Sequence, residues 1–322
     1  MTNTPPVCNY EGSDYQQSFW EKGGREYEDR AEAIALKKML PESGKLMLEL
    51  GAGAGRNTPR YAGFEQIVVL DYSITQLAQA QEKLGRSDPR GAAPKYIYVA
   101  ADVYRLPFCD RQFDAATMIR TLHHMADAPK ALSQIRNVLQ PNAVFVLEFA
   151  NKLNLKSILR YWLGRQSWNP FTLEPVEFVK LNFDFHPKAI RNWLGELGFS
   201  IEKTLTVSHF RLGLLKKIIP ARLLAALDGL FQPTGAFWQF TPSVFVKARR
   251  GDLYGRPGAG TGTARDNHAS PAPTSVVDLF KCPECENEKL IEKKDHLYCS
   301  NCKSQWAVRD GIYDFREKIM QG

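Results

Sequence analysis

Short apolar runs alternate with helical patterns along the first 250 residues, and no other pattern in the sequence limits the choice of fold as strongly. Near-continuous apolar runs bounded by Gly, Pro or Asp are typical of strands buried on both faces of a sheet. Five such runs are 46–50, 67–71, 96–101, 113–119 and 144–149, and two further strand candidates are 199–207 and 243–248. Helix-like segments such as 73–84 and 129–139 lie between them. The alternation predicts an α/β fold with a doubly wound, mostly parallel sheet of seven strands.

The first predicted strand runs directly into a glycine-rich turn at residues 51–55, and the second strand ends in Asp71. Glycines at a strand-to-turn junction let the main chain approach a ligand closely. An acidic side chain at the end of the next strand can accept hydrogen bonds from ribose hydroxyl groups. The combination predicts a site for a cofactor that contains a nucleoside.

Two details argue against a dinucleotide cofactor. The third glycine of the fingerprint Gly-x-Gly-x-x-Gly would fall at position 56, which is Arg56. Glu49 precedes the loop, where a carboxylate would repel a pyrophosphate but attract a cation. S-adenosylmethionine carries an ammonium and a sulfonium group and no phosphate, so acidic residues suit its charges. The third strand ends at Asp102 and Val103, which offer a carboxylate to the adenine amino group beside an apolar contact.

On these motifs, residues from about 25 to 250 resemble a class I S-adenosylmethionine-dependent methyltransferase of the type 11 group, with a Rossmann-like fold. Segment 106–127 also resembles that family's path into and out of its fourth strand. The resemblance implies in-line displacement at the sulfonium methyl group, and an antiparallel seventh strand at the sheet edge, which 243–248 would supply. Thr121 would border the cofactor. The cofactor contacts that the resemblance implies are Glu49, Gly51, Ala52, Gly53, Gly55, Asp71, Tyr72, Asp102, Val103 and Arg120.

The acidic residues of this set have structural alternatives. Asp71 could instead cap the helix that follows it. Glu49 could instead form a local ion pair with Arg56 or Arg60. The sequence leaves these alternatives open.

Two adjacent histidines, His123 and His124, follow the fourth predicted strand. An imidazole titrates near neutrality, so His124 is the candidate general base for methyl transfer. A polar loop after the strand is the alternative interpretation for both residues. Many acceptors are nucleophilic without a base, so the need for one is left open.

Near the C-terminus the sequence holds two Cys-x-x-Cys pairs thirteen residues apart: Cys282, Cys285, Cys299 and Cys302. Four thiolates at this spacing predict a tetrahedral Zn²⁺ site of the ribbon type. Because the protein fills every ligand position, the predicted metal is structural and not catalytic. A redox dithiol or a disulfide pair is the alternative. The remaining cysteines, Cys8 and Cys109, are predicted to be ordinary residues.

Residues 277–322 resemble the small zinc-ribbon proteins that bind and activate methyltransferases, down to the turn 310–312 after Trp306. The resemblance implies docking through strand addition and an apolar face. The partner would be the chain's own methyltransferase domain or another one. Gly and Pro are frequent at 251–276, which predicts a flexible linker between a methyltransferase domain at 1–250 and the ribbon.

Two insertions are expected to cover the active site. The aromatic residues of 151–185 fit either a planar or apolar acceptor or an ordinary lid core. The insertion 209–240 carries Lys216, Lys217 and Arg222 along an apolar helical face. Such a helix fits either contact with an anionic membrane surface or packing on its own domain.

The favoured function is a methyltransferase that acts on a small or lipid-like acceptor, with the ribbon stabilising or regulating it. An RNA or translation-factor methyltransferase, with the ribbon as recognition module, is one alternative, and a non-catalytic scaffold is another. Residues 1–250 hold 32 Lys and Arg against 24 Asp and Glu, whereas 251–322 hold 10 against 11. A ribbon with this charge balance does not favour RNA binding.

A cytoplasmic location is expected, because the opening residues 1–14 are polar and no apolar run is long enough to span a membrane. Six cysteines with four in one cluster also suit a reducing compartment. The methyl acceptor, the oligomeric state, and docking of the ribbon in cis or in trans are left open by the sequence.

Overall fold

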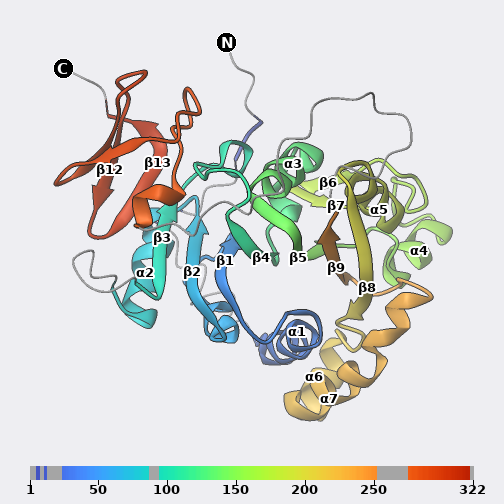
Figure 1. Ribbon diagram of the computed structural model, residues 1–322. Helices are drawn as coiled ribbons and strands as arrows, with labels where there is room; N and C mark the ends of the chain where they lie inside the picture. The colour runs from blue at the N-terminus through green and yellow to red at the C-terminus, as the bar shows by residue number, and fades with distance from the viewer. Residues whose placement is uncertain (1–4, 8–10, 13–23, 87–93, 252–274, 320–322) are drawn as a thin grey trace.

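A computed structural model describes residues 5–7, 11–12, 24–86, 94–251 and 275–319. One large sheet runs through it, in the order β10-β11-β12-β13-β3-β2-β1-β4-β5-β9-β8 (Figure 1). The seven predicted runs all form strands of this sheet: β1 (Gly44–Leu50), β2 (Phe64–Asp71), β3 (Tyr96–Ala100), β4 (Phe113–Met118), β5 (Leu139–Ala150), β8 (Phe199–Val207) and β9 (Ser243–Arg250).

Among the residues that the structure describes the sheet has eleven strands, so the expectation of a seven-stranded sheet is wrong. Residues 44–250 supply seven of them, and the C-terminal residues add four: β10 (Leu290–Glu292), β11 (His296–Cys299), β12 (Gln305–Arg309) and β13 (Ile312–Lys318). The extra strands join because β13 pairs in parallel with β3, which would otherwise form the edge. Strand order depends on such distant pairings, which local patterns do not reveal.

The position expected for the antiparallel strand is also wrong. Strand β9 is antiparallel, but it lies between β5 and β8 and not at the edge of the sheet. Its side chains Val244, Phe245 and Val246 are buried on both faces, as an internal strand requires. Because β5 and β8 both run antiparallel to β9, they are parallel to each other and end at the same edge of the sheet.

Helices cover both faces of the sheet. Alternate residues of β1 point to opposite sides: Leu48 belongs to one core cluster and Met47 to the other. The cluster around Leu48 includes residues of α3 (Ala128–Val138) and α5 (Pro187–Glu196). The cluster around Met47 includes residues of three other helices: α1 (Glu26–Met39), α2 (Ile74–Leu84) and α7 (Ala221–Phe231). This arrangement is the doubly wound fold that the sequence predicts.

The first insertion follows β5 and forms a short helix and a hairpin. Its elements are α4 (Leu155–Trp162), β6 (Val176–Val179) and β7 (Asn182–Asp184). The hairpin is joined to the sheet at its base, because Phe185 N donates to Ala150 O (2.8 Å) and Lys152 N donates to Phe185 O (3.0 Å).

The second insertion forms two helices, α6 (Gly213–Ile218) and α7, and not one continuous helix. The break falls at Pro220, whose ring cannot continue the hydrogen bonding of α6. Leu224 and Ala225 of α7 are buried in the cluster that includes α1. No helix within the described ranges is both long and apolar enough to cross a bilayer.

Short 3-10 turns connect several elements near the carboxyl edge of the sheet and beyond it. They are η2 (Thr58–Tyr61), η3 (Val103–Arg105), η4 (Leu122–His124), η5 (Gln232–Ala236) and η7 (Val276–Leu279). Most of the predicted linker, residues 252–274, lies outside the described residues. Its last predicted residue, Val276, begins η7.

The ribbon docks against β3 of its own chain (Figure 1). Besides the β13–β3 ladder, Cys109 N donates to Leu279 O and Lys281 N donates to Pro107 O, both at 2.9 Å. Phe280 is fully buried in this contact, and its ring stacks on Phe108 with centroids 5.8 Å apart. Strand addition and an apolar face therefore join the ribbon to the larger domain.

Candidate functional site

A cavity opens at the carboxyl ends of β1 and β4, where connections leave the sheet in opposite directions. Strand β1 pairs with β2 on one side and with β4 on the other, so this is the switch point at which α/β sheets bind ligands. Six of the predicted cofactor residues line it: Gly51, Gly53, Asp71, Tyr72, Val103 and Arg120. The cavity walls do not include the other four, which are Glu49, Ala52, Gly55 and Asp102.

The glycine loop takes a shape that other residues would not tolerate. All three glycines have positive φ: 65° at Gly51, 53° at Gly53 and 70° at Gly55. A Cβ at Gly51 would lie 2.1 Å from the Thr121 hydroxyl oxygen, whereas one at Gly53 would meet nothing closer than 3.8 Å. A Cβ at Gly55 would lie 2.8 Å from the side chain of Leu84. Gly53 thus faces the cavity, and Gly55 lets the loop approach α2.

Asp71 is placed to bind a ligand while it holds the loop. Its Oδ2 accepts from Gly53 N (2.8 Å) and its Oδ1 from Ser73 N (2.9 Å). The helix cap is Ser73, whose hydroxyl accepts from Gln76 N, so the capping role considered for Asp71 falls to its neighbour. Burial raises the pKa of the Asp71 carboxyl. Each carboxylate oxygen has a second lone pair for a ribose hydroxyl.

Glu49 lies buried beneath the loop, where its carboxyl accepts from the Thr58 hydroxyl at 2.6 Å. Burial raises the pKa of Glu49 to about 8. The arginines considered as partners of Glu49 pair with other carboxylates: Arg56 with Asp29 and Glu32 of α1, and Arg60 with Asp29.

Asp102 caps a turn behind the cavity. Its Oδ1 accepts from Tyr104 N at 2.9 Å and so begins η3, which carries Val103 into the cavity wall. Burial raises the pKa of the Asp102 carboxyl. Its contact with adenine stays a prediction.

Arg120 borders the cavity in a left-handed conformation, with φ of 54°. Its main-chain N donates to Glu148 (2.9 Å), and its guanidinium pairs with Glu32 of α1. Burial raises the pKa of Glu32, but Arg120 and Arg56 outweigh it, so the net pKa is lowered. Ser243 of β9 holds Glu148 from the far side (2.6 Å). The charge of Arg120 is thus largely balanced by protein, and the residue was reached in the sequence only through the family resemblance.

His124 lines the cavity from η4 and is buried. Its Nδ1 lies 3.1 Å from Leu181 O, and a carbonyl can only accept, so Nδ1 is the donor. Burial lowers the pKa of His124. The pKa of His123 lies well below its ordinary value, because of burial first and the neighbouring His124 second. A neutral imidazole that donates through Nδ1 carries its basic lone pair on Nε2, the arrangement a general base needs.

Sequence reasoning missed part of the cavity wall. Leu50 and Leu70 are the last apolar residues of their strands, and Ala101 follows β3, so each could have been found from the strand ends. Val7, Gln76 and Met125 carry no comparable signal, because their positions depend on how distant segments pack.

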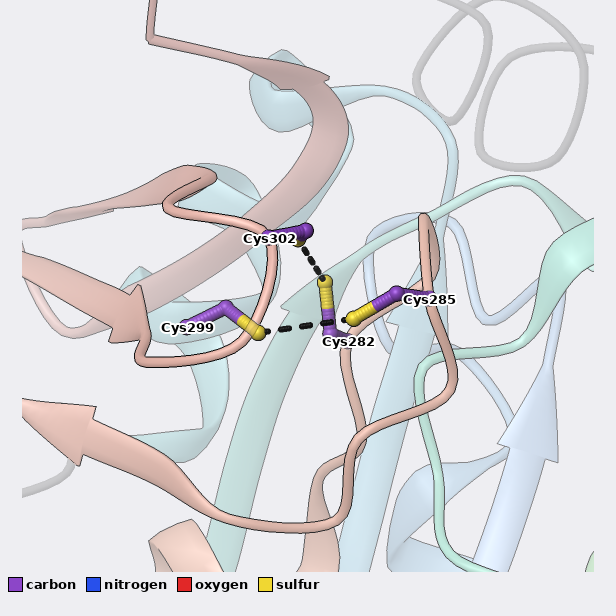
Figure 2. A group of neighbouring side chains, drawn as sticks. All are labelled: Cys282, Cys285, Cys299 and Cys302. Atoms are coloured by element: carbon purple, nitrogen blue, oxygen red, sulfur yellow. Dashed lines mark hydrogen bonds between the residues drawn. The ribbon is translucent and has the colours of Figure 1, made fainter.

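The four C-terminal cysteines converge on one point (Figure 2). Their sulfur atoms all lie within 4.8 Å of one another, and two of the pairs, Cys282 with Cys302 and Cys285 with Cys299, are 3.5 and 3.6 Å apart. A disulfide needs about 2.05 Å, whereas tetrahedral Zn–S bonds of about 2.3 Å separate the sulfurs by roughly 3.8 Å. The geometry therefore suits a metal with four thiolate ligands.

The remaining cysteines do not change this assignment. Burial raises the pKa of Cys109 to about 12, which makes its thiol a poor nucleophile and fits the ordinary role predicted for it. Cys8 lies outside the described residues.

Comparison with known proteins gives one family and several relatives. Residues 48–147 match the family described as "Methyltransferase domain". A 2-phytyl-1,4-naphtoquinone methyltransferase of Nostoc punctiforme is 28% identical over 200 residues, which cover 56% of this chain and 84% of that protein. One of the same name from Trichormus variabilis is 35% identical over 121 residues, which cover 36% of this chain and 52% of the relative. The chain thus spans most of the first relative and about half of the second.

A solved structure shares the fold. It is the complex of the Haloferax volcanii Trm112 methyltransferase activator with a methyltransferase, which aligns with a TM-score of 0.50 at 15% identity. The alignment covers 74% of this chain and 96% of that one. At this identity the likeness extends to the fold alone.

Replacing Asp71 by alanine is expected to lower the affinity for S-adenosylmethionine at least ~100-fold, because hydrogen bonds to a charged group contribute about 1.5–3 kcal/mol each. Titration calorimetry measures the affinity. The matched control is Asp114→Ala, since Asp114 also accepts two main-chain N–H groups, those of Lys45 (2.7 Å) and Leu46 (3.0 Å), but at the opposite end of β1. Both variants should lose stability and only Asp71→Ala should lose binding. Equal binding by the two would refute the assignment.

Glu49 should make stability depend on pH. Its pKa is about 8 in the folded protein against an ordinary value of 4.5, so between these values the folded protein keeps a proton that the unfolded chain has lost. The free energy of unfolding therefore falls as pH rises through this range. Glu49→Gln should flatten the profile measured by urea unfolding from pH 5 to 8. The control is Glu65→Gln on the exposed side of β2, and identical slopes for wild type and Glu49→Gln would contradict the prediction.

Proposed function

We propose, from the premise that this chain carries an S-adenosylmethionine-dependent methyltransferase domain, that it methylates a lipid-like acceptor with a quinone-type ring. Two relatives are named for a phytyl-substituted naphthoquinone, which combines an aromatic ring with an isoprenoid tail. The observation that carries the proposal is an insertion with many aromatic residues, 151–185, that reaches back to the cofactor cavity at His124.

The insertion meets the cavity through its hairpin. Leu181, in the turn between β6 and β7, accepts the hydrogen bond from His124. Several large apolar side chains of the same insertion remain exposed, among them Phe171, Phe178 and Trp162. This insertion exposes apolar side chains and is hydrogen-bonded to the cavity, so it can guide a hydrophobic acceptor ring to the methyl group of the cofactor.

S-adenosylmethionine supplies a methyl group on a sulfonium, which the acceptor takes by in-line displacement as the sulfonium becomes a thioether. Asp71 and the glycine loop would fix the nucleoside, and the buried cavity would exclude water. A reduced quinone loses a proton when it is methylated at a ring carbon or a hydroxyl oxygen. His124 would take that proton at Nε2, since its Nδ1–H is engaged by Leu181.

The proposal is tested with the reduced form of 2-phytyl-1,4-naphthoquinone as acceptor. We expect one methyl group to be gained, detected by mass spectrometry of the extracted quinol. His124→Gln should lower kcat by about 10²–10⁴, while the affinity for S-adenosylmethionine changes little, because glutamine can donate to Leu181 but cannot take a proton. The loss of kcat should be larger at low pH than at high pH, because at high pH the acceptor ionises without a base.

The matched control is His123→Gln, which replaces the adjacent histidine and should retain most activity. A protein that binds cofactor but methylates neither this quinol nor any lipid of a membrane extract would overturn the assigned acceptor class. Methylation of RNA under the same conditions would favour the recognition role considered for the ribbon.

For the ribbon, we propose that Zn²⁺ held by Cys282, Cys285, Cys299 and Cys302 keeps it folded as a stabilising module in cis. The chemistry of four thiolates suits that ion. Support comes from Arg316 of β13, which contacts the cofactor side directly: its Nη1 donates to Tyr72 O at 3.2 Å, and its guanidinium lies 5.7 Å from the centre of the Tyr72 ring. Asp314 holds Arg316 in place (2.9 and 3.0 Å). Because Tyr72 lines the cavity, the ribbon would support the cofactor site through this contact.

Elemental analysis should find about one Zn²⁺ per chain. Removal of the metal by a chelator should lower both the melting temperature and the affinity for S-adenosylmethionine. Arg316→Ala should retain zinc yet lower that affinity roughly 3–10-fold, since a cation–π contact and a hydrogen bond contribute about 0.5–1.5 kcal/mol. The control is Lys289→Ala on the exposed side of the ribbon. A metal-free protein with intact thiols, or unchanged affinity in Arg316→Ala, would reject the respective part of the proposal.

A further inference from the structure

A second hollow lies at the same edge of the sheet as the cofactor cavity, beyond β5. It is a groove of about 820 Å³ between α4 on one side and the segment around η5 on the other. Thr206 of β8 and Pro242, just before β9, also line it. Strands β4, β5 and β8 all end at this edge, so the groove and the cofactor cavity open toward the same side of the molecule.

Apolar side chains line the groove and continue onto the surface around it. The groove walls include Leu155, Leu159 and Leu163 from α4 and its end, and Trp238 and Phe240 after η5. All five are among the exposed large apolar residues of the protein. Next to these walls, Trp162 is 69% exposed and Phe237 is 81% exposed. Contiguous apolar surface of this kind marks an interaction site.

The charged side chains that line the groove are all cations. Lys156, Arg160 and Arg165 line the groove, and no carboxylate among the described residues forms an ion pair with them. The sequence from 151 to 165 contains no Asp or Glu, and the segment 209–240 contains one, Asp228. Asp228 is fully buried and accepts from Tyr27 and His209, so it does not offset the exposed cations.

We infer that this apolar and cationic face docks the protein on the surface of an anionic phospholipid bilayer. Exposed Trp and Phe suit the boundary between head groups and acyl chains, and the cations around them suit anionic head groups. A second copy of the chain fits less well, because a two-fold interface through this face would set its cations against each other. Docking here would also turn the edge that holds the cofactor cavity toward the membrane.

The inference goes beyond the proposed function, and its test needs neither cofactor nor turnover. The full chain is sedimented with vesicles of phosphatidylcholine alone, or with about one third phosphatidylglycerol. Binding is expected to the anionic vesicles only, and to weaken as salt is raised, because exposed charges are screened. The triple variant Lys156→Glu, Arg160→Glu, Arg165→Glu should bind more than ~50-fold more weakly, since each surface cation contributes about fivefold.

The matched control reverses the same number of charges on the ribbon, with Lys289→Glu, Lys293→Glu and Lys294→Glu, all of which are exposed. It should bind within about threefold of the wild type, since these residues lie away from the docking face. A second variant, Trp162→Ala with Phe237→Ala, keeps every charge and should weaken binding at least about tenfold. Circular dichroism melting checks that each variant is folded.

Three results would overturn the inference. One is sedimentation of the wild type that does not differ between neutral and anionic vesicles. Another is an equal loss of binding in the groove and ribbon triple variants, which would show attraction to net charge without a docking face. The third is a dimer, seen by light scattering, that Trp162→Ala with Phe237→Ala dissociates, because a second copy would then occupy the face.

Discussion

The attachment of the glycine loop to the end of β2 is the constraint on which the cofactor cavity depends. Ala52 N donates to Leu70 O (2.9 Å) and Gly53 N donates to Asp71 (2.8 Å), so two consecutive main-chain groups of the loop are fixed to one strand. Moving the loop would leave buried N–H groups unpaired, at about 1–3 kcal/mol each. Asp71 therefore shapes the site before any ligand arrives, and the ligand meets a wall of main chain that is already in place.

A single carboxylate joins the two sides of that cavity. Glu32 of α1 pairs with Arg56, which follows the glycine loop, and with Arg120, which follows β4. A buried ion pair is costly to desolvate, but two guanidinium partners together supply enough hydrogen bonds to hold Glu32 ionised, in line with its lowered pKa. Helix α1 therefore links the segments on the two sides of the switch point through Glu32, in addition to covering one face of the sheet.

Local features of the fold could be predicted from the sequence, and features that depend on distant contacts could not. The strands were found because burial on both faces leaves a continuous apolar run, and the cysteine cluster because its ligands lie on two short turns. The antiparallel direction expected for 243–248 is correct, but its expected position at the edge is wrong, since its place between β5 and β8 depends on pairings distant in the sequence. Glu49 and Asp102 were predicted to contact the cofactor, and in the structure Thr58 and Tyr104 donate hydrogen bonds to them behind the cavity wall. Glu32 escaped notice because nothing in its helix marks its distant arginine partners.

The pairing of β13 with β3 explains why the ribbon and the larger domain form one sheet. Without it, β3 would present an unpaired edge next to the apolar side chains of Leu106 and Phe108, which are buried when the ribbon is docked. A parallel partner for β3 requires a long connection along the chain. Strand β13 meets this requirement, because it is the last strand of the sheet in the sequence. The strand that closes this edge also carries Arg316 to Tyr72. Protection of the edge and the contact of Arg316 with Tyr72 therefore come from the same seven residues of β13, and any change that releases this strand affects both.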